Sequence, residues 1–261
     1  MPTPFNHLRV AYDLRPLLSA AWRARLDADW PAFLLGNIAP DVQTVSGQAR
    51  EATHFFSVPL AASPPAVETL LRLFPELAQP ARLPAAQSAF LAGYLAHLEF
   101  DVEWVRAIFE PVFGPAQTWG AFPERIYLHN ALRAYWDAED LQALPAETGP
   151  ALARARPPGP DAGGERGAGW LPFVTGAHLA RWRDQVAEQL QGDGQAATIA
   201  VFAERMGVDP EAFRRLVESP AAMNERVFAR VPLARLADYR AATLAHTAAR
   251  LEAYWAGAIG Q

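Results

Sequence analysis

The chain has 261 residues, of which 51% are hydrophobic, so it holds enough apolar material for one large domain or two small ones. Lys and Arg total 23 against 28 Asp and Glu, which gives a formal charge of −5, and no general electrostatic attraction to nucleic acid is expected. The absence of cysteine excludes disulfides, thiolate zinc sites and cysteine nucleophiles, so any metal must be held by His, Asp, Glu or backbone groups.

Apolar residues recur at helical spacing along nearly the whole chain, and strand-type alternation is scarce. Ala, Leu, Arg and Glu dominate these segments, and all four favour helix. The pattern predicts an all-α protein. In chain order, the predicted helices cover residues 5–26, 29–35, 63–76, 84–112, 122–139, 171–192, 196–206, 209–219, 221–228 and 231–258.

A segment rich in Pro, Gly and Ala, 145–170, interrupts this pattern. Its composition predicts an exposed loop or linker. It separates a helical core, 1–144, which we expect to bind metal, from C-terminal helices, 171–261, which we expect to pack on that core.

The sequence predicts neither a secretory signal nor a membrane span. The N-terminal residues lack the basic start and unbroken apolar run of a secretory signal, and no later apolar run approaches 18 residues. We therefore expect a cytoplasmic protein without a transmembrane segment.

His97 and Asp101 lie four residues apart in the apolar stretch "FLAGYLAHLEFDVEW". Four residues turn a helix by about 400°, so both side chains share one face and could bind one ion together. Gly93, one turn earlier, leaves room on that face for a bound group or a close neighbour. An ionised Asp buried alone costs several kcal/mol, so Asp101 needs a cation or a hydrogen-bonded partner. The alternative is that Asp101 only orients a core histidine.

Two further segments carry ligand-type side chains beside apolar residues. Asp41 ends "FLLGNIAPD", where it could bind a metal or cap the next turn. His54 precedes two phenylalanines, where it could bind a metal or pack in the core. Taken together with His97 and Asp101, these nitrogen and oxygen groups favour zinc, with iron or manganese as alternatives.

The order of these motifs resembles the bacterial zinc-dependent phospholipase C family, which is distantly similar to the single-strand-specific zinc nucleases. The resemblance rests on His7 before an apolar first helix, "LLGNIAPD" ending in Asp41, "THF" with His54, and "GYLAHLEFD" with His97 and Asp101. It covers roughly residues 1 to 140.

The resemblance implies a multi-helix bundle of the zinc phospholipase C type and a cluster of one to three zinc ions. Asp41, His54, His97 and Asp101 would form the first metal site, and Asp101 would bridge to a second ion held by His7. Asp41 is also the candidate catalytic base. Family members with a third zinc use an H-x-x-x-E pair, whereas here the residue four after His129 is an arginine, so His129 is a candidate ligand without that partner.

The function implied is metal-dependent hydrolysis of a phosphoester through an activated water, with a small molecule or a phospholipid head group as substrate. Arg50 and Arg106 flank the candidate ligands and could bind phosphate, although solvent-facing arginines are common. The alternative function is a non-catalytic helical binding or interaction module that retains the scaffold. A nucleotide phosphohydrolase with an adjacent His-Asp pair is disfavoured because no "HD" dipeptide occurs.

Overall fold

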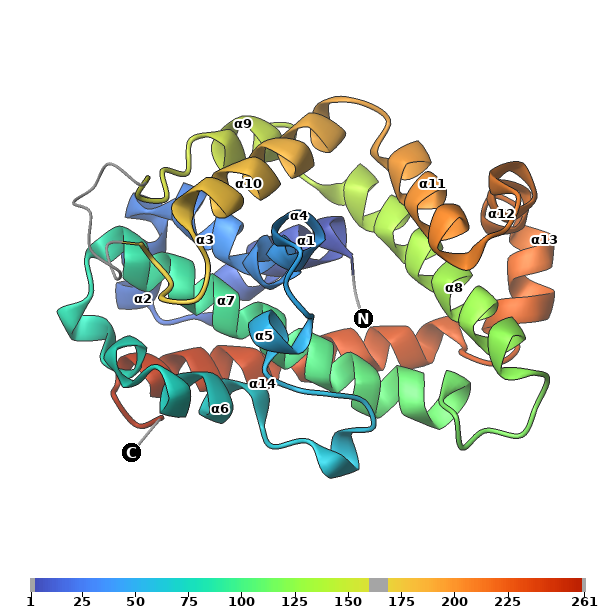
Figure 1. Cartoon of the computed structure of the whole chain (residues 1–261), viewed down its shortest axis with the longest axis horizontal. Coiled ribbons are helices and arrows are strands. Elements are labelled where there is room, and N and C mark those ends of the chain that lie inside the picture. Colours follow the sequence, from blue (N-terminus) through green and yellow to red (C-terminus); the bar gives the residue numbers. More distant parts are fainter. Residues whose placement is uncertain (1–2, 160–168, 260–261) are drawn as a thin grey trace.

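The computed structural model describes residues 3–159 and 169–259, and within these ranges helices make up the regular structure, with one isolated bridge between Leu171 and Val174 (Figure 1). The α-helices are α1 (Pro4–Leu14), α2 (Ala20–Ala28), α3 (Trp30–Ile38), α4 (Gln43–Ser46), α5 (Glu51–His54), α6 (Ala66–Leu73), α7 (Ala85–Trp104), α8 (Phe122–Ala143), α9 (Thr148–Ala153), α10 (Gly176–Gln191), α11 (Gly194–Met206), α12 (Pro210–Val217), α13 (Pro220–Met223) and α14 (Leu233–Trp255). The all-α prediction is confirmed.

The close crossing of α3 and α7 forms the centre of the core. A Cβ atom added to Gly36 would lie 1.9 Å from the main-chain oxygen of Phe90, and one added to Gly93 would lie 2.3 Å from that of Phe33. Since no side chain fits at either position, both glycines are required for this approach. The space left by the missing side chain of Gly93 is therefore occupied by a close neighbour, helix α3.

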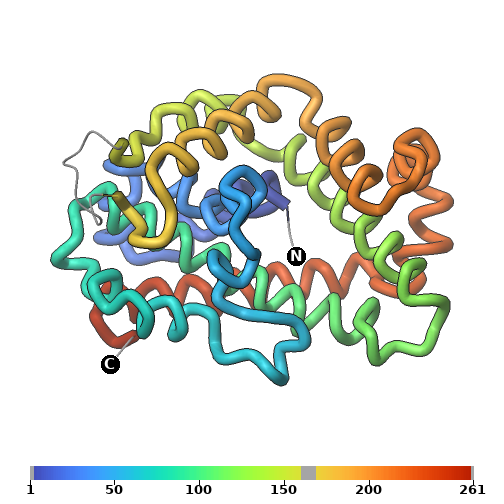
Figure 2. Tube along the Cα trace, viewed as in Figure 1, coloured from blue at the N-terminus to red at the C-terminus, as the bar shows by residue number. Residues whose placement is uncertain are grey.

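The long C-terminal helix α14 covers the opposite side of α7. Figure 2 shows α14 in red running beside α7 along the length of the molecule, and the two helices are in contact. Tyr239 donates a hydrogen bond of 2.9 Å to the main-chain oxygen of Phe100, and Arg250 donates one of 2.9 Å to Glu99. With α3 on one side and α14 on the other, α7 is held as a buried axis that fixes the side chains projecting from it.

Two of the longer predicted helices are interrupted. The predicted helix 5–26 is broken by a 3₁₀ turn at Arg15–Leu17, because Pro16 has no N–H to donate. The predicted helix 84–112 changes after Trp104 into a π-helical segment, Val105–Phe113. Pro111 lies in that segment and cannot bond the main-chain oxygen four residues earlier, at Ala107. Arg235 of α14 donates to that oxygen instead, at 2.6 Å.

The segment 145–170 is more ordered than its composition predicts. It contains α9, in which Ala151 and Leu152 are buried, so the prediction of an exposed loop is wrong for these residues. Helix α9 packs against α10, and a Cβ added to Gly149 would lie 3.5 Å from the Cβ of Leu190, an ordinary van der Waals contact. Residues 160–168 of the predicted loop lie outside the described residues.

The helices after residue 171 pack on the N-terminal helices. Trp182 of α10 donates a hydrogen bond of 2.7 Å from its indole nitrogen to the main-chain oxygen of Ile38, at the end of α3. None of the described helices has both the length and the apolar composition that a membrane span requires.

Candidate metal centre

Four segments bring five His and Asp side chains to one place in the core. His97 and Asp101 project from α7, and His7 from α1. Asp41 lies in the 3₁₀ turn that continues α3, and His54 ends the single-turn helix α5. The sequence predicted this set of residues, although helices α4 and α5, which carry the chain from Asp41 to His54, were not predicted.

The ligand atoms of these residues lie at the spacing of a small coordination shell. Asp101 is central: its Oδ1 is 3.4 Å from Nε2 of His7, and its Oδ2 is 3.4 Å from Nε2 of His54 and 3.7 Å from Nε2 of His97. Asp41 Oδ1 is 3.6 Å from Nε2 of His54. Two ligands bound tetrahedrally to zinc at 2.0–2.1 Å would be roughly 3.3–3.5 Å apart.

The ligand atoms form two overlapping groups. His7, His97 and Asp101 make one group, and Asp41, His54 and His97 make the other, with the atoms of each group within 4.8 Å of one another. The rings of His7 and His97 also stack, with centroids 3.6 Å apart. The arrangement therefore has room for one ion or for two neighbouring ions that share ligands.

Main-chain carbonyls fix the orientation of two imidazole rings. Nδ1 of His97 lies 2.8 Å from the main-chain oxygen of Asn37, and Nδ1 of His54 lies 3.3 Å from that of Arg50. Nδ1 of His54 also lies 3.1 Å from the hydroxyl of Thr53. Because a carbonyl oxygen only accepts, Nδ1 of His97 carries a proton, and in the neutral ring the lone pair is then on Nε2. That lone pair is the metal-binding one, and a hydrogen bond of this kind orients many histidine ligands.

Several buried polar atoms of the cluster are left without a partner. Nε2 of His7, His54 and His97 and Oδ1 of Asp101 are buried, and no described residue forms a hydrogen bond with them. Each such group costs free energy unless something pairs with it. These atoms belong to residues of the two groups and come from three segments; a cation could satisfy them, and the mixture of imidazole and carboxylate suits zinc.

The charge states in the cluster are those that bind a metal. Burial, together with the neighbouring His97, lowers the pKa of His7 to about 4, and burial also lowers the pKa of His54. Burial would raise the pKa of Asp101, but the positive potential of His97 and the contact with His7 hold it well below its usual range. Neutral imidazoles of His7 and His54 and an ionised Asp101 carboxylate are therefore present at neutral pH, as metal binding requires.

Comparison of the chain with protein-family models, with curated proteins and with solved structures finds no match. The assignment of the cluster therefore depends on its own geometry and on the order of its motifs in the sequence.

Arg50 lies directly against the cluster. Its Nη2 is 2.7 Å from Oδ2 of Asp101, and its guanidinium carbon is 4.5 Å from the centre of the Phe56 ring. Arg50 thus provides a positive charge beside the buried carboxylate. Arg106, the other arginine considered from the sequence, is largely exposed and pairs with Glu103 instead.

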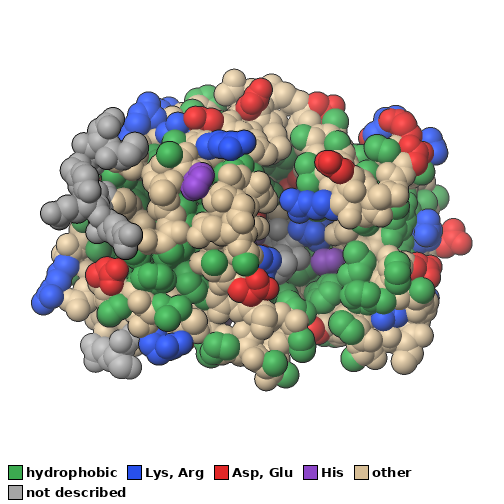
Figure 3. Space-filling view, in the orientation of Figure 1, with side chains coloured by type: hydrophobic (Ala, Val, Ile, Leu, Met, Phe, Trp, Pro, Cys, Tyr) green, Lys and Arg blue, Asp and Glu red, His purple; other side chains and the backbone are tan. Residues whose placement is uncertain are grey.

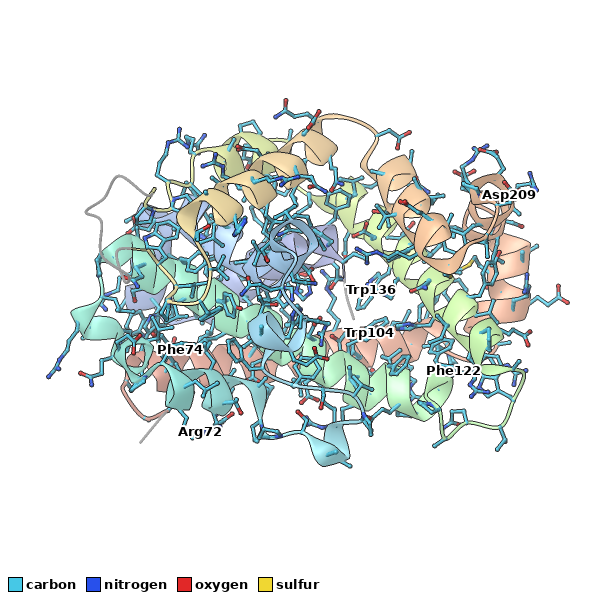
Figure 4. The ribbon with its side chains drawn as sticks, viewed as in Figure 1. Arg72, Phe74, Trp104, Phe122, Trp136 and Asp209 are labelled. Atoms are coloured by element: carbon cyan, nitrogen blue, oxygen red, sulfur yellow. The ribbon has the colours of Figure 1, made fainter. Side chains whose placement is uncertain are left out.

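His129 lies apart from the cluster. Its Nε2 accepts a hydrogen bond of 2.9 Å from the indole nitrogen of Trp104, and the rings of Phe109 and Phe113 lie 4.9 and 5.2 Å away. Figure 4 shows Trp104 beneath Trp136 near the middle of the view, and their rings stack at 5.3 Å. Burial keeps the pKa of His129 well below its usual value. The structure does not bring His129 into either group of ligand atoms.

Asp41 marks the open edge of the cluster. Its side chain is 21% exposed, whereas those of His7, His54, His97 and Asp101 are at most 2% exposed. Burial would raise the pKa of Asp41, but the contact with His54 and the positive potential of His97 outweigh it, so the carboxylate stays ionised. Asp41 is thus the member of the cluster that solvent reaches.

Sequence reasoning missed the main-chain groups of the site. The carbonyl of Asn37 orients His97, and that of Arg50 orients His54, but a carbonyl belongs to every residue and leaves no mark in the sequence. The signal that could have found Asn37 is its place in "GNIAPD", one turn before the candidate ligand Asp41.

Proposed function

We propose that the chain is a metal-dependent phosphoester hydrolase, similar to phospholipase C, that uses zinc. The observation that carries the proposal is the gathering of His7, His54, His97 and Asp101, which have buried atoms without a hydrogen-bond partner and imidazole–carboxylate distances of 3.4, 3.4 and 3.7 Å, close to the spacing of tetrahedral ligands. The resemblance of the motif order to zinc phospholipases C supports the same conclusion. One to three ions stay a prediction, and the two groups of ligand atoms favour one or two.

The residues that would hold the metal are His7, Asp41, His54, His97 and Asp101. Bound zinc would supply a Lewis acid that makes a water more acidic and neutralises charge on phosphoryl oxygens. Asp41, ionised and at the open edge, is placed to accept the proton of an attacking water. Asp101 and the three histidines are buried, and they would keep the site rigid and exclude bulk solvent.

Arg50 would orient the substrate. A guanidinium group matches two oxygens of a phosphate, and this one is fixed by Asp101 and by the ring of Phe56. Its side chain is 23% exposed, so a ligand at the open edge of the cluster could contact it. A phosphoester small molecule or a phospholipid head group fits these requirements, and the cytoplasmic location stays a prediction.

The test combines metal analysis with a hydrolysis assay. Protein stripped with a chelator and reloaded with zinc should retain about one or two ions per chain and should hydrolyse bis-p-nitrophenyl phosphate. His54→Asn should lose both properties, because it removes a ligand atom from the cluster. His178→Asn is the matched control, since His178 lies on α10 and contacts Thr175. Absence of near-stoichiometric zinc would overturn the proposal, and tight zinc binding without hydrolysis would favour the non-catalytic module.

A further inference from the structure

A cavity of about 120 Å³ opens beside Asp41, between the N-terminal helices and α8, α10 and α11. Arg133 lines it from α8, and Arg205 lines it from α11. Figure 3 shows a hollow near the middle of the face in view with positively charged side chains around it. Because the sequence contains no lysine, these side chains are arginines. The cavity adjoins the member of the cluster that solvent reaches, so a substrate group next to the reacting phosphate would lie in it.

Three threonine hydroxyls line the cavity, and their protons are already committed. Thr198 donates a hydrogen bond of 2.6 Å to the carboxylate of Asp137, and Thr3 donates to the same carboxylate. Thr44 donates one of 2.9 Å to the main-chain oxygen of Asp41. A hydroxyl group has a single proton and two lone pairs. These three side chains can therefore only accept further hydrogen bonds, and a ligand that bonds to them must donate.

Two glutamines of α10 add groups that both donate and accept. Gln185 and Gln189 are one turn apart, and both line the cavity. Among the residues that the structure describes, neither side-chain amide forms a hydrogen bond. Each amide has an oxygen that accepts and a nitrogen that donates. The lining thus combines hydroxyl oxygens that accept with amides that do both.

This lining disfavours charged groups as ligands. An ammonium group could donate to the threonine oxygens, but it would lie near the positive charge of Arg205, whose side chain is exposed at the cavity. A carboxylate or phosphate would be attracted to Arg205, but it only accepts, and no proton would lie between it and the threonine oxygens. An alcohol hydroxyl carries no charge and both donates and accepts, so it matches this mixed set of groups.

We infer that this cavity binds the hydroxyl groups of a neutral polyol that is esterified to the reacting phosphate, so that the preferred substrate is a phosphodiester of a polyhydric alcohol. The inference rests on the proposed function and adds the substrate class. Gln185 and Gln189 would hold the hydroxyl groups, while the phosphodiester to be cleaved lies at Asp41 and Arg50.

Four p-nitrophenyl phosphodiesters, which differ in the second alcohol, test this with the zinc-loaded protein: the 3,4-dihydroxybutyl, butyl, 3-carboxypropyl and choline esters. The value of kcat/KM should be at least about tenfold higher for the dihydroxybutyl ester than for each of the others, because two hydrogen bonds together contribute on this scale. Gln185→Leu and Gln189→Leu should each reduce the preference for the dihydroxybutyl over the butyl ester by about threefold, mainly through KM. Neither side chain is buried, so both variants are expected to fold.

Gln191→Leu is the matched control, since Gln191 is an exposed glutamine of α10 outside the cavity, and it should leave the preference unchanged. Equal values for the dihydroxybutyl and butyl esters, a preference for the carboxypropyl or choline ester, or an unchanged preference in either cavity variant would each overturn the inference while leaving the hydrolase function intact. If none of the four diesters is hydrolysed, the proposed function fails and this inference fails with it.

Discussion

Nδ1 of His97 lies 2.8 Å from the main-chain oxygen of Asn37. This contact joins a candidate ligand on α7 to the C-terminal end of α3, where carbonyl groups lack partners within the helix. It forms because Gly36 and Gly93 allow the two helices to approach, so the packing of the core and the orientation of the ligand depend on the same crossing.

Replacing Gly93 by Ala should destabilise the protein and weaken zinc binding together. The added methyl would lie 2.3 Å from the main-chain oxygen of Phe33, so α3 and α7 must separate, and overpacking of this kind costs about 1–3 kcal/mol or more. Urea denaturation and zinc titration measure the two effects. Gly159→Ala is the control, because no atom lies within 4 Å of its added Cβ. Normal zinc affinity in a destabilised Gly93→Ala protein would contradict the coupling.

Removal of a cluster histidine and removal of His129 should have different effects on zinc content. His97→Asn should lower zinc affinity by at least about tenfold, because it removes a ligand from both groups of ligand atoms. His129→Gln should retain zinc, since the Nε2 atom it replaces is bonded to Trp104. Metal analysis after dialysis against a weak chelator distinguishes them, and zinc loss in His129→Gln would show that His129 is a ligand after all.

Replacing Arg50 by Gln should lower the stability of the metal-free protein and increase the rise in Tm that zinc produces. Asp101 would lose the cation 2.7 Å away, which costs about 1–3 kcal/mol for this partly exposed pair, and zinc would then take its place without competition. Thermal denaturation with and without zinc should show a larger rise in Tm for this variant than for the wild type. Arg106→Gln should behave as the wild type because its partner Glu103 is outside the cluster. An equal rise in Tm for both variants would count against competition at Asp101.

The buried carboxyl of Asp137 should make stability depend on pH. Burial raises its pKa to about 6, above the value of about 4 expected in the unfolded chain, so the folded state binds its proton more tightly. Its contribution to stability is complete below about pH 4 and is lost as the pH rises through 6, with a total of about 3 kcal/mol. Asp137→Asn does not titrate, so its stability relative to the wild type should increase between pH 4 and pH 7.

Urea denaturation at several pH values measures this difference, and the other titrating groups cancel because both proteins contain them. Asp184→Asn is the matched control, since Asp184 is 63% exposed and its replacement should give a difference that varies little with pH. A difference for Asp137→Asn that is constant from pH 4 to pH 7 would refute the prediction.

Residue spacing predicted the helical fold and the shared face of His97 and Asp101, because these properties are local or repeat along the chain. The full set of five cluster residues was predicted from ligand-type side chains beside apolar segments and from the resemblance in motif order. His97 and Asp101 are four residues apart, and residues at that spacing share one face of any helix. Helix α7 itself was predicted from its apolar length. The short helices α5 and α9 were not predicted, since a single turn has too few residues to show a period and is stabilised by its tertiary contacts.

The position of His129 could not be read from the sequence. Its spacing within α8 resembles that of a ligand, but its environment is set by Trp104 and by Phe113 in the π-helical segment, which the chain brings together only on folding. Arg133 and Arg205 were likewise not predicted as a pair, because they are 72 positions apart and meet across a cavity between two helices. Pairings of this kind depend on how helices are oriented, which periodicity does not encode.

The five cluster residues all come from the first 101 positions, whereas Gln189 and Arg205, which lie with Asp41 around one cavity, come from α10 and α11. A substitution after residue 171 therefore keeps all five cluster side chains in the chain, while it can alter the surroundings of Asp41.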